Sequence, residues 1–228
     1  MKIGTDGVLL GAWANLEHQP FSILDIGAGT GVVALMLAQR SHAEVVDALE
    51  IDDEAYEQAS ENFEASPWND RLFCYHAGFL EFVQEIDDEY DLIVSNPPFF
   101  NPSLSTSSLQ KSENSISKAR EMARFNDALP FEHLLAGTAN LLSREGKACF
   151  IIPFQEEQKF LFIAAAVGLF PNKITHVKGT PTSEIKRSLL ELSFTRSDVF
   201  NTELVIETDR HVYTPEYVGL TKDFYLKM

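Results

Sequence analysis

Four short apolar runs alternate with helical patterns over the first hundred residues of the chain. Strands and helices that alternate in this way form a parallel, doubly wound sheet, because each crossover returns the chain to the same sheet with a right-handed connection. The four predicted strands lie at residues 21–26, 44–51, 71–76 and 91–95. Later runs at residues 148–152, 173–178 and 189–195 bring the prediction to seven strands. The connection between the last two runs has no long helical pattern, so we expect an antiparallel last strand.

Length and composition predict one domain over residues 1–228. A chain of 228 residues with 45% hydrophobic content can bury a single sizeable core. The longest apolar run, at residues 160–167, is too short to span a membrane, and we expect no signal peptide. Cys74 and Cys149 lie in apolar strand-like runs and are expected to be reduced, which favours the cytoplasm. No cluster of histidine or cysteine has metal-site spacing, so no metal is expected.

The distribution of charge bears on nucleic acid as a partner. The net charge is −16, and residues 1–99 carry all of it, with 19 acidic and 3 basic residues, whereas residues 100–228 carry 15 of each. Because phosphate affinity comes from local clusters of lysine and arginine, we expect an RNA to contact this second part. The candidate residues are Lys186, Arg187, and Arg120 and Arg124 in an irregular, serine-rich loop at 100–128 beside the site. Scattered solvated charges are the alternative interpretation of these residues.

Residues 21–31 predict a strand that ends in a glycine-rich turn before a helix. Gly27, Gly29 and Gly31 follow Asp25 in the pattern Asp-x-Gly-x-Gly-x-Gly. Glycines let the backbone turn tightly and approach a ligand closely, but this spacing differs from the Gly-x-Gly-x-x-Gly of dinucleotide sites. A carboxylate before the turn disfavours a pyrophosphate. It suits a cationic ligand such as the amino-acid part of S-adenosylmethionine.

The ends of the second and third predicted strands supply further candidates for the same ligand. Glu50 lies 23 residues after Gly27, where an acid holds a ribose diol in sheets of this type. We expect Ile51 beside it, together with Gly78 and Phe79, to hold an adenine through backbone groups and apolar contacts. Phe79 is the predicted wall of the adenine pocket.

The fourth predicted strand stops at Asn96-Pro97-Pro98-Phe99. Neither proline can donate to a sheet ladder, and Pro97 biases Asn96 away from helix. The carboxamide oxygen of Asn96 and the carbonyl of Pro97 form a pair of acceptors for an amino group, and Phe99 offers a flat surface to a planar ring. A Pro-Pro turn after a core strand is the structural alternative. The carboxyl edge of an open α/β sheet is where ligands bind, which favours a site.

Residues 1–20 predict a short N-terminal element. Gly4, Thr5, Asp6 and Gly7 precede a helical pattern, and the side-chain oxygen of Thr5 or Asp6 can cap this helix. In the functional interpretation these four residues lie over a bound cofactor, and the element covers the site.

Taken together, these motifs resemble the class I S-adenosylmethionine-dependent methyltransferases, which have a Rossmann-like fold, and the Asn-Pro-Pro-Phe signature resembles that of enzymes that methylate amino groups. More narrowly, the chain resembles the bacterial tRNA1(Val) adenine-N6 methyltransferases over nearly all of its length. The Gly-Thr-Asp-Gly opening and the ending at residues 213–217 and 220–226 carry this narrower resemblance. It implies S-adenosylmethionine as cofactor, a valine tRNA as partner and methylation of adenine 37 beside the anticodon, with no obligate protein partner. The catalytic residues would be Asn96, Pro97, Pro98 and Phe99.

Two other kinds of function stay open on the sequence. A protein glutamine amide or a ribosomal RNA guanine presents a similar planar nitrogen to Asn-Pro-Pro-Phe, and an acidic chain tolerates a protein substrate. A non-catalytic scaffold with the same fold is the other alternative. A scaffold would not need Asn96, Pro97 and Phe99 together.

Overall fold

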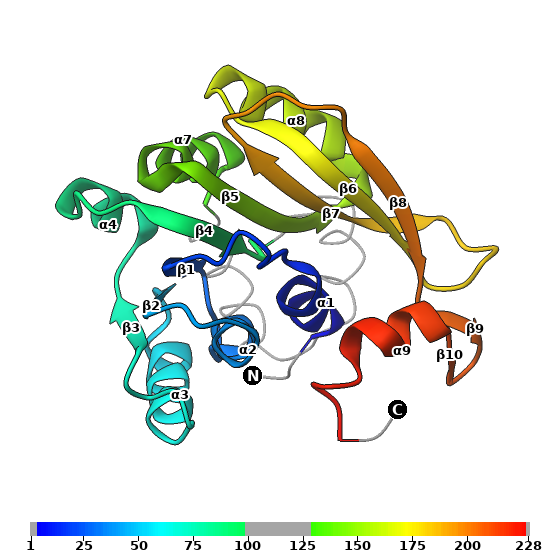
Figure 1. Ribbon diagram of the computed structural model, residues 1–228, viewed down its shortest axis with the longest axis horizontal. Coiled ribbons are helices and arrows are strands. Elements are labelled where there is room, and N and C mark those ends of the chain that lie inside the picture. Colours follow the sequence, from blue (N-terminus) through cyan, green and yellow to red (C-terminus); the bar gives the residue numbers. More distant parts are fainter. Residues whose placement is uncertain (1–3, 99–128, 227–228) are drawn as a thin grey trace, which may run out of the picture.

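The computed structural model describes residues 4–98 and 129–226, which form one mixed sheet with helices on both faces (Figure 1). The first half of the sheet contains β1 (Ser22–Ile26), β2 (Val45–Glu50), β3 (Leu72–His76) and β4 (Tyr90–Ser95). The second half contains β5 (Leu142–Pro153), β6 (Phe170–Lys178), β7 (Ile185–Ser193) and β8 (Phe200–Val205). A small hairpin of β9 (Glu207–Asp209) and β10 (Val212–Tyr213) follows β8.

Seven α-helices in the described residues cover the two faces of this sheet (Figure 1). One face carries α1 (Thr5–Trp13), α2 (Val32–Arg40), α3 (Asp53–Glu64) and α9 (Pro215–Thr221). The other face carries α4 (Phe79–Glu85), α7 (Phe131–Leu141) and α8 (Glu157–Ala166), and a short 3₁₀ turn, Phe154–Glu156, precedes α8. None of the described helices is long and apolar enough to cross a membrane.

The strand order confirms the predicted fold class, a largely parallel, doubly wound sheet. The order is β3-β2-β1-β4-β5-β7-β6-β8, and among these strands only β7 runs antiparallel to its neighbours. The sheet has eight strands rather than the predicted seven. The additional strand, β8, pairs in parallel with β6 at one edge of the sheet, and Leu204 is its one buried residue. An edge strand with so little buried surface has no apolar run, which is why the sequence did not indicate it.

The start of β7 also differs from the expectation. Lys186 and Arg187 were assigned to the connection before this strand, but the strand begins at Ile185 and includes both. Arg187 pairs with Pro153 of β5 and with Val177 of β6. Backbone pairing with two neighbouring strands therefore holds Arg187 at the carboxyl edge of β5 and β6.

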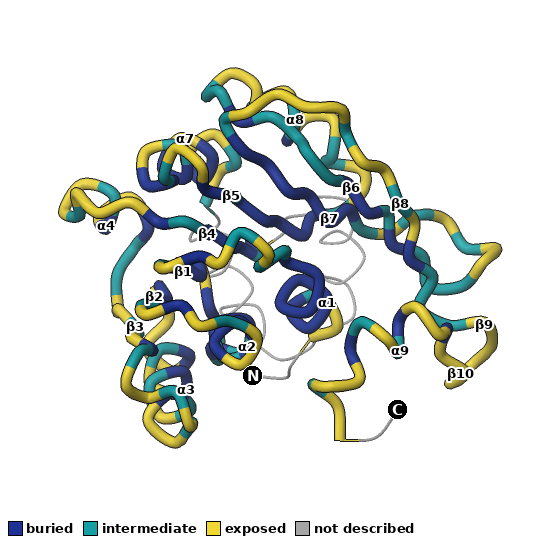
Figure 2. Tube along the Cα trace, viewed as in Figure 1, coloured by how far each residue is buried: buried dark blue, intermediate teal, exposed yellow. Residues whose placement is uncertain are grey.

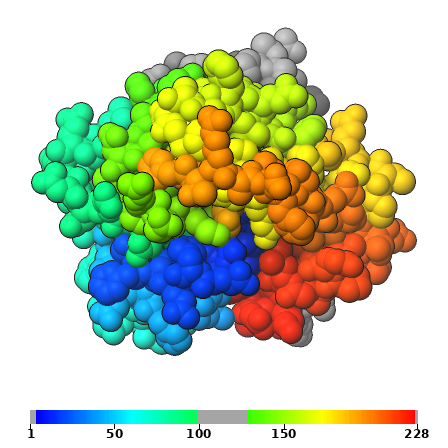
Figure 3. Space-filling view, turned by 45° about the horizontal axis from the view of Figure 1, so that its top comes forward, coloured from blue at the N-terminus to red at the C-terminus, as the bar shows by residue number. Residues whose placement is uncertain are grey.

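The N-terminal helix α1 is part of the core. Every residue from Gly7 to Trp13 is buried, as the dark tube of α1 shows (Figure 2). The indole Nε1 of Trp13 donates to Thr175 Oγ1 in β6 at 2.9 Å. Leu220 and Phe224, near the end of the described chain, pack against residues of α1, so the two ends of the chain meet on this face (Figures 1 and 3).

The expected side-chain cap of this helix is absent. The N-cap residue is Gly4, and no side chain accepts a hydrogen bond from the first turn. Asp6 instead accepts from Arg187, whose Nε lies 2.8 Å from Asp6 Oδ2. The prediction that Thr5 or Asp6 caps the helix is therefore wrong, because Gly4 is the N-cap and both residues lie within the first turn of the helix.

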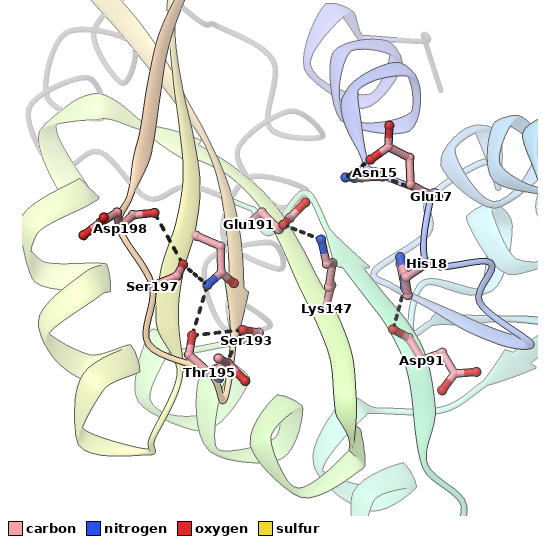
Figure 4. Close-up of polar contacts among 11 residues, drawn as sticks. Asn15, Glu17, His18, Asp91, Lys147, Glu191, Ser193, Thr195, Ser197 and Asp198 are labelled. Carbon is pink, nitrogen blue, oxygen red and sulfur yellow. Dashed lines mark hydrogen bonds and ion pairs between the residues drawn. The ribbon is translucent and has the colours of Figure 1, made fainter.

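Polar contacts tie the strands together at the amino edge of the sheet (Figure 4). Lys147 Nζ lies 2.8 Å from Glu191 Oε1, and His18 Nε2 lies 3.1 Å from the carbonyl of Asp91. A hollow of about 300 Å³ at this edge is lined by Lys147, Asn172 and neighbouring residues. It lies at the far end of the strands from the glycine-rich turn, so these contacts are structural.

Close packing between α4 and α7 generates a stability prediction. A Cβ on Gly137 would lie 2.5 Å from Cε1 of the buried Phe79 ring, whereas a Cβ on Gly219 in α9 would meet nothing within 4 Å. We expect Gly137→Ala to lower the free energy of unfolding by about 1–3 kcal/mol through overpacking. Gly219→Ala, the matched control, should raise it by up to about 1 kcal/mol. Chemical denaturation measures both, and a stabilised Gly137→Ala would contradict this packing.

Candidate active site at the carboxyl edge

The glycine-rich turn, Glu50 and Asn96 lie side by side, because the strands that lead to them are parallel and in register. Ile26, the last residue of β1, pairs with Leu49 of β2 on one side and with Ser95 of β4 on the other. The glycine-rich turn, Glu50 and Asn96 follow directly after these three residues. The structure therefore brings the predicted cofactor residues and the predicted catalytic residue to one edge of the sheet.

The glycines of the turn have two different roles. Gly27, Gly29 and Gly31 have φ angles of 73°, 60° and 76°, a left-handed conformation that favours glycine. A Cβ on Gly27 would meet nothing within 4 Å, but a Cβ on Gly31 would lie 2.4 Å from Cε1 of Phe63 in α3. Gly27 therefore leaves room for a ligand to approach the backbone. Gly31 lets α2 and α3 pack closely.

Glu50 organises this turn. Its Oε2 accepts from the backbone N–H of Gly29 at 2.7 Å, and its Oε1 accepts from Ile51 and Asp52 at 2.8 and 2.9 Å. Such charge-assisted bonds hold the turn against the end of β2. A carboxylate has about four acceptor positions in all, so Glu50 can still accept from a hydroxyl group. The predicted role toward a ribose is compatible with this geometry.

Asp25 lies beneath the turn, where it is only 1% exposed. Its Oδ2 accepts from the backbone N–H of Ala34 at 3.1 Å. Burial raises the pKa of Asp25 to about 7; the Ala34 hydrogen bond opposes this shift, and the negative charge of Glu50 adds to it. A cationic group bound near the turn would favour the ionised form. The Asp25 carboxylate would therefore interact with such a cationic group from beneath the turn, without being exposed at its surface.

The structure buries Phe79, the predicted wall of an adenine pocket. The Phe79 ring is buried, packs against Gly137 of α7 and belongs to the core on the α4 face. The ring therefore leaves little surface exposed to a ligand. Ile51 is 53% exposed, and its Cδ1 would lie 3.7 Å from a Cβ on Gly78. Of the three residues predicted to hold an adenine, Ile51 is therefore the one with an exposed apolar side chain, and it lies beside Gly78.

The Asn-Pro-Pro segment begins where β4 ends. Ser95 is buried, and its Oγ donates to the carbonyl of Ile26 at 2.8 Å, which fixes the end of β4 against β1. Asn96 is half-buried, Pro97 buried and Pro98 exposed. Three other predicted site residues, Phe99, Arg120 and Arg124, lie outside the described residues.

The N-terminal residues approach the turn from the α1 side. A Cβ on Gly7 would lie 3.5 Å from Cγ1 of Val32, the residue that follows Gly31. Gly4 and Thr5 are exposed at the start of α1. The sequence predicted that Asp6 contacts the cofactor and that Arg187 contacts an RNA. It did not predict the contact between the two side chains. A separation of 181 residues leaves no local pattern that would reveal such a pair.

The described residues contain no cluster of three or more histidine, cysteine or acidic side chains able to hold a metal ion. They do provide the features that an S-adenosylmethionine molecule needs. Gly27 leaves open space at the turn, Glu50 retains acceptor capacity and Ile51 is an exposed apolar side chain. The residues present therefore fit this cofactor.

Comparison with known proteins agrees with this geometry. Residues 8–129 match the family described as methyltransferase small domain. A tRNA1(Val) (adenine(37)-N6)-methyltransferase from Flavobacterium johnsoniae is 62% identical, and the match covers 100% of this chain and 94% of that protein. The chain belongs to this methyltransferase family. A relative of the same name from a Bacteroides fragilis strain is 44% identical over 100% of this chain and 92% of its own. The family member described here is therefore an S-adenosylmethionine-dependent methyltransferase.

Solved structures show the same fold at low sequence identity. The crystal structure of a predicted O-methyltransferase from Agrobacterium tumefaciens has a TM-score of 0.69 and 20% identity, covering 96% of both chains. A ribosomal protein L11 methylase from Lactobacillus delbrueckii has a TM-score of 0.56 and 18% identity, covering 83% of this chain and 78% of that one. The methyltransferase fold of the family therefore extends well beyond its close relatives.

The buried carboxyl of Asp25 generates a pH prediction. Its pKa of about 7 lies above the value of 3.8 for an exposed aspartate. The folded protein thus binds this proton more tightly than the unfolded chain, and the resulting stability is lost as pH rises through 7. Between pH 6 and pH 8 we expect the ligand-free wild type to lose about 1 kcal/mol more than Asp25→Asn. Urea unfolding at the two pH values measures this difference, and equal losses would contradict it.

Proposed function

We propose that this methyltransferase transfers a methyl group from S-adenosylmethionine to the N6 amino group of adenine 37 in tRNA1(Val), in the cytoplasm. The observation that carries the proposal is the identity of 62% with a relative of that name, over the whole of this chain. The position of Asn96-Pro97-Pro98 at the end of β4, next to the glycine-rich turn, supports it. The whole described chain acts as one domain in this proposal.

Cofactor binding would use the edge formed by β1, β2 and the start of α4. The backbone at Gly27 and Gly29 approaches the amino-acid part of the cofactor, and the carboxylate of Asp25 beneath the turn favours its positive charge. Glu50 accepts from the ribose hydroxyls. Ile51 and Gly78 border the adenine. When bound, S-adenosylmethionine supplies an activated methyl group on its sulfonium.

Asn96 and Pro97 would act on the amino group of the target adenine. The lone pair of that nitrogen is delocalised into the ring, so the group is a poor nucleophile. If the Asn96 side-chain oxygen and the Pro97 carbonyl accept its two protons, the nitrogen becomes more tetrahedral and its lone pair points at the methyl group. Pro97 is buried at the end of β4, and the rigid dipeptide keeps the two acceptors at a fixed separation. No strong general base is required, because the methylated nitrogen is acidic enough to lose its proton.

The rest of the rate enhancement would come from positioning. A base in an anticodon loop must be turned out of its stack to reach Asn96. Phe99 would stack on this base, a contact worth about 1–3 kcal/mol in single-stranded recognition. Lys186, at the start of β7, would contact the tRNA backbone. Arg120 and Arg124 are candidates for the same role.

The reaction is tested by methyl transfer from labelled S-adenosylmethionine. Total tRNA and total protein from cells that lack this enzyme serve as the two acceptors. We expect label in tRNA, N6-methyladenosine after digestion, and recovery of the label in the valine acceptor. Label only in protein would move the assignment to a glutamine amide. Label in another RNA would contradict the proposed acceptor.

The role of Asn96 is tested by substitution. Because Asn96 acts on the amino group through its side-chain oxygen, Asn96→Ala should lower kcat by about 10²–10³-fold, the usual effect of removing one transition-state hydrogen bond. The dissociation constant for S-adenosylmethionine should stay within about threefold of wild type.

Asn201→Ala is the matched control, because this asparagine is exposed on β8 at the edge of the sheet. It should leave both kcat and the cofactor dissociation constant unchanged. A parallel loss of turnover and cofactor binding in Asn96→Ala would show that Asn96 is structural.

A further inference from the structure

One ion pair joins the first turn of α1 to the start of β7. Arg187 Nε lies 2.8 Å from Asp6 Oδ2, and the two side chains are 33% and 28% exposed. The sequence suggested separate ligands for these residues, the cofactor for Asp6 and the tRNA for Arg187. Their contact with each other indicates a different role.

Both partners are fixed at the carboxyl edge of the sheet by the elements that carry them. Arg187 pairs through its backbone with Pro153 at the end of β5 and with Val177 near the end of β6. Asp6 lies in the first turn of α1, whose remaining residues are buried from Gly7 onward. The ion pair therefore connects a rigid sheet edge to the exposed start of a buried helix.

The start of α1 contacts the element that carries the glycine-rich turn. A Cβ on Gly7 would lie 3.5 Å from Val32 Cγ1 and 3.7 Å from Val33 Cγ2. These two residues open α2, directly after Gly31. Displacement of the first turn of α1 would therefore also displace the start of α2 and the glycine-rich turn that precedes it. The N-cap residue Gly4 has no side chain to cap this end of α1, and Arg187 donates to the Asp6 carboxylate in the first turn.

We propose that the Asp6–Arg187 ion pair positions the first turn of α1 against the glycine-rich turn, so that both residues set cofactor affinity without either contacting the cofactor or the tRNA. This inference rests on the proposed function in taking the edge beside β1 as the cofactor site. A partly exposed ion pair adds little to global stability, because solvent screens it. Its effect is therefore local, on the geometry of the crevice.

A double-mutant cycle tests the proposal through cofactor binding alone. The dissociation constant for S-adenosylmethionine is measured calorimetrically without tRNA for Asp6→Asn, Arg187→Gln and the double variant. Each single substitution should raise it by about tenfold, and the double variant should be no weaker than either single one, as expected for two residues that act as a unit. Arg187→Lys should bind the cofactor more tightly than Arg187→Gln but less tightly than wild type, because lysine keeps the positive charge and lacks the planar guanidinium donor.

A matched control breaks a similar ion pair elsewhere at the same edge. Lys178 Nζ, at the end of β6, lies 2.7 Å from Glu203 Oε2 in β8. Glu203→Gln removes this pair without touching α1, so the cofactor dissociation constant should stay at the wild-type value. Melting temperatures of all variants should remain within a few degrees of wild type, because surface pairs contribute little.

Three results would overturn the proposal. Additive effects of the two substitutions on cofactor affinity would show that the residues act separately. A raised KM for tRNA in Arg187→Gln, with unchanged cofactor affinity, would make Arg187 a tRNA contact. Unchanged cofactor affinity in both single variants would remove any positioning role. Because binding is measured without tRNA, failure of the proposed tRNA reaction would leave this test intact.

Discussion

The carboxylate of Glu50 accepts three backbone hydrogen bonds, and the crevice depends on this small network. The donors are the N–H groups of Gly29, Ile51 and Asp52, so one side chain joins the glycine-rich turn of β1 to the end of β2. Parallel pairing of the two strands brings these groups within reach, because Ile26 and Leu49 are partners in the sheet. The turn is therefore shaped before any ligand arrives, and a preformed site loses less conformational entropy on binding.

The carboxylates of Glu50 and Asp25 lie near this turn in different environments. Glu50 has charge-assisted hydrogen bonds from the backbone, whereas Asp25 is enclosed beneath the turn with one hydrogen bond, from Ala34. Burial and the nearby negative charge of Glu50 raise the pKa of Asp25 to about 7. Two neighbouring acids are unfavourable in an empty site and favourable when a cation binds near them. The charge of the site is thus matched to a cationic ligand rather than to a phosphate.

Residues from near both ends of the described chain pack together on the α1 face of the sheet. Helix α1 is buried against the sheet, where Trp13 donates to Thr175, and Leu220 and Phe224 cover it from outside. The N-terminal helix therefore contributes to the core from Gly7 onward, whereas its start is exposed. This arrangement explains why a short segment that precedes the first strand takes part in the fold of the whole domain.

The sequence by itself determined the elements whose signals are local. Apolar runs indicated the strands that carry the turn and Asn96, and glycine at positions 27, 29 and 31 indicated a tight turn, whose three glycines have left-handed backbone in the structure. Tertiary structure alone decided which side chains near the turn are exposed: the Phe79 ring packs into the core, whereas Ile51 is exposed. It also decided the partner of Asp6, because an ion pair across 181 residues depends on how distant elements pack. Local backbone preferences are encoded in neighbouring residues, whereas the direction and partner of a side chain follow from the packing of the complete domain.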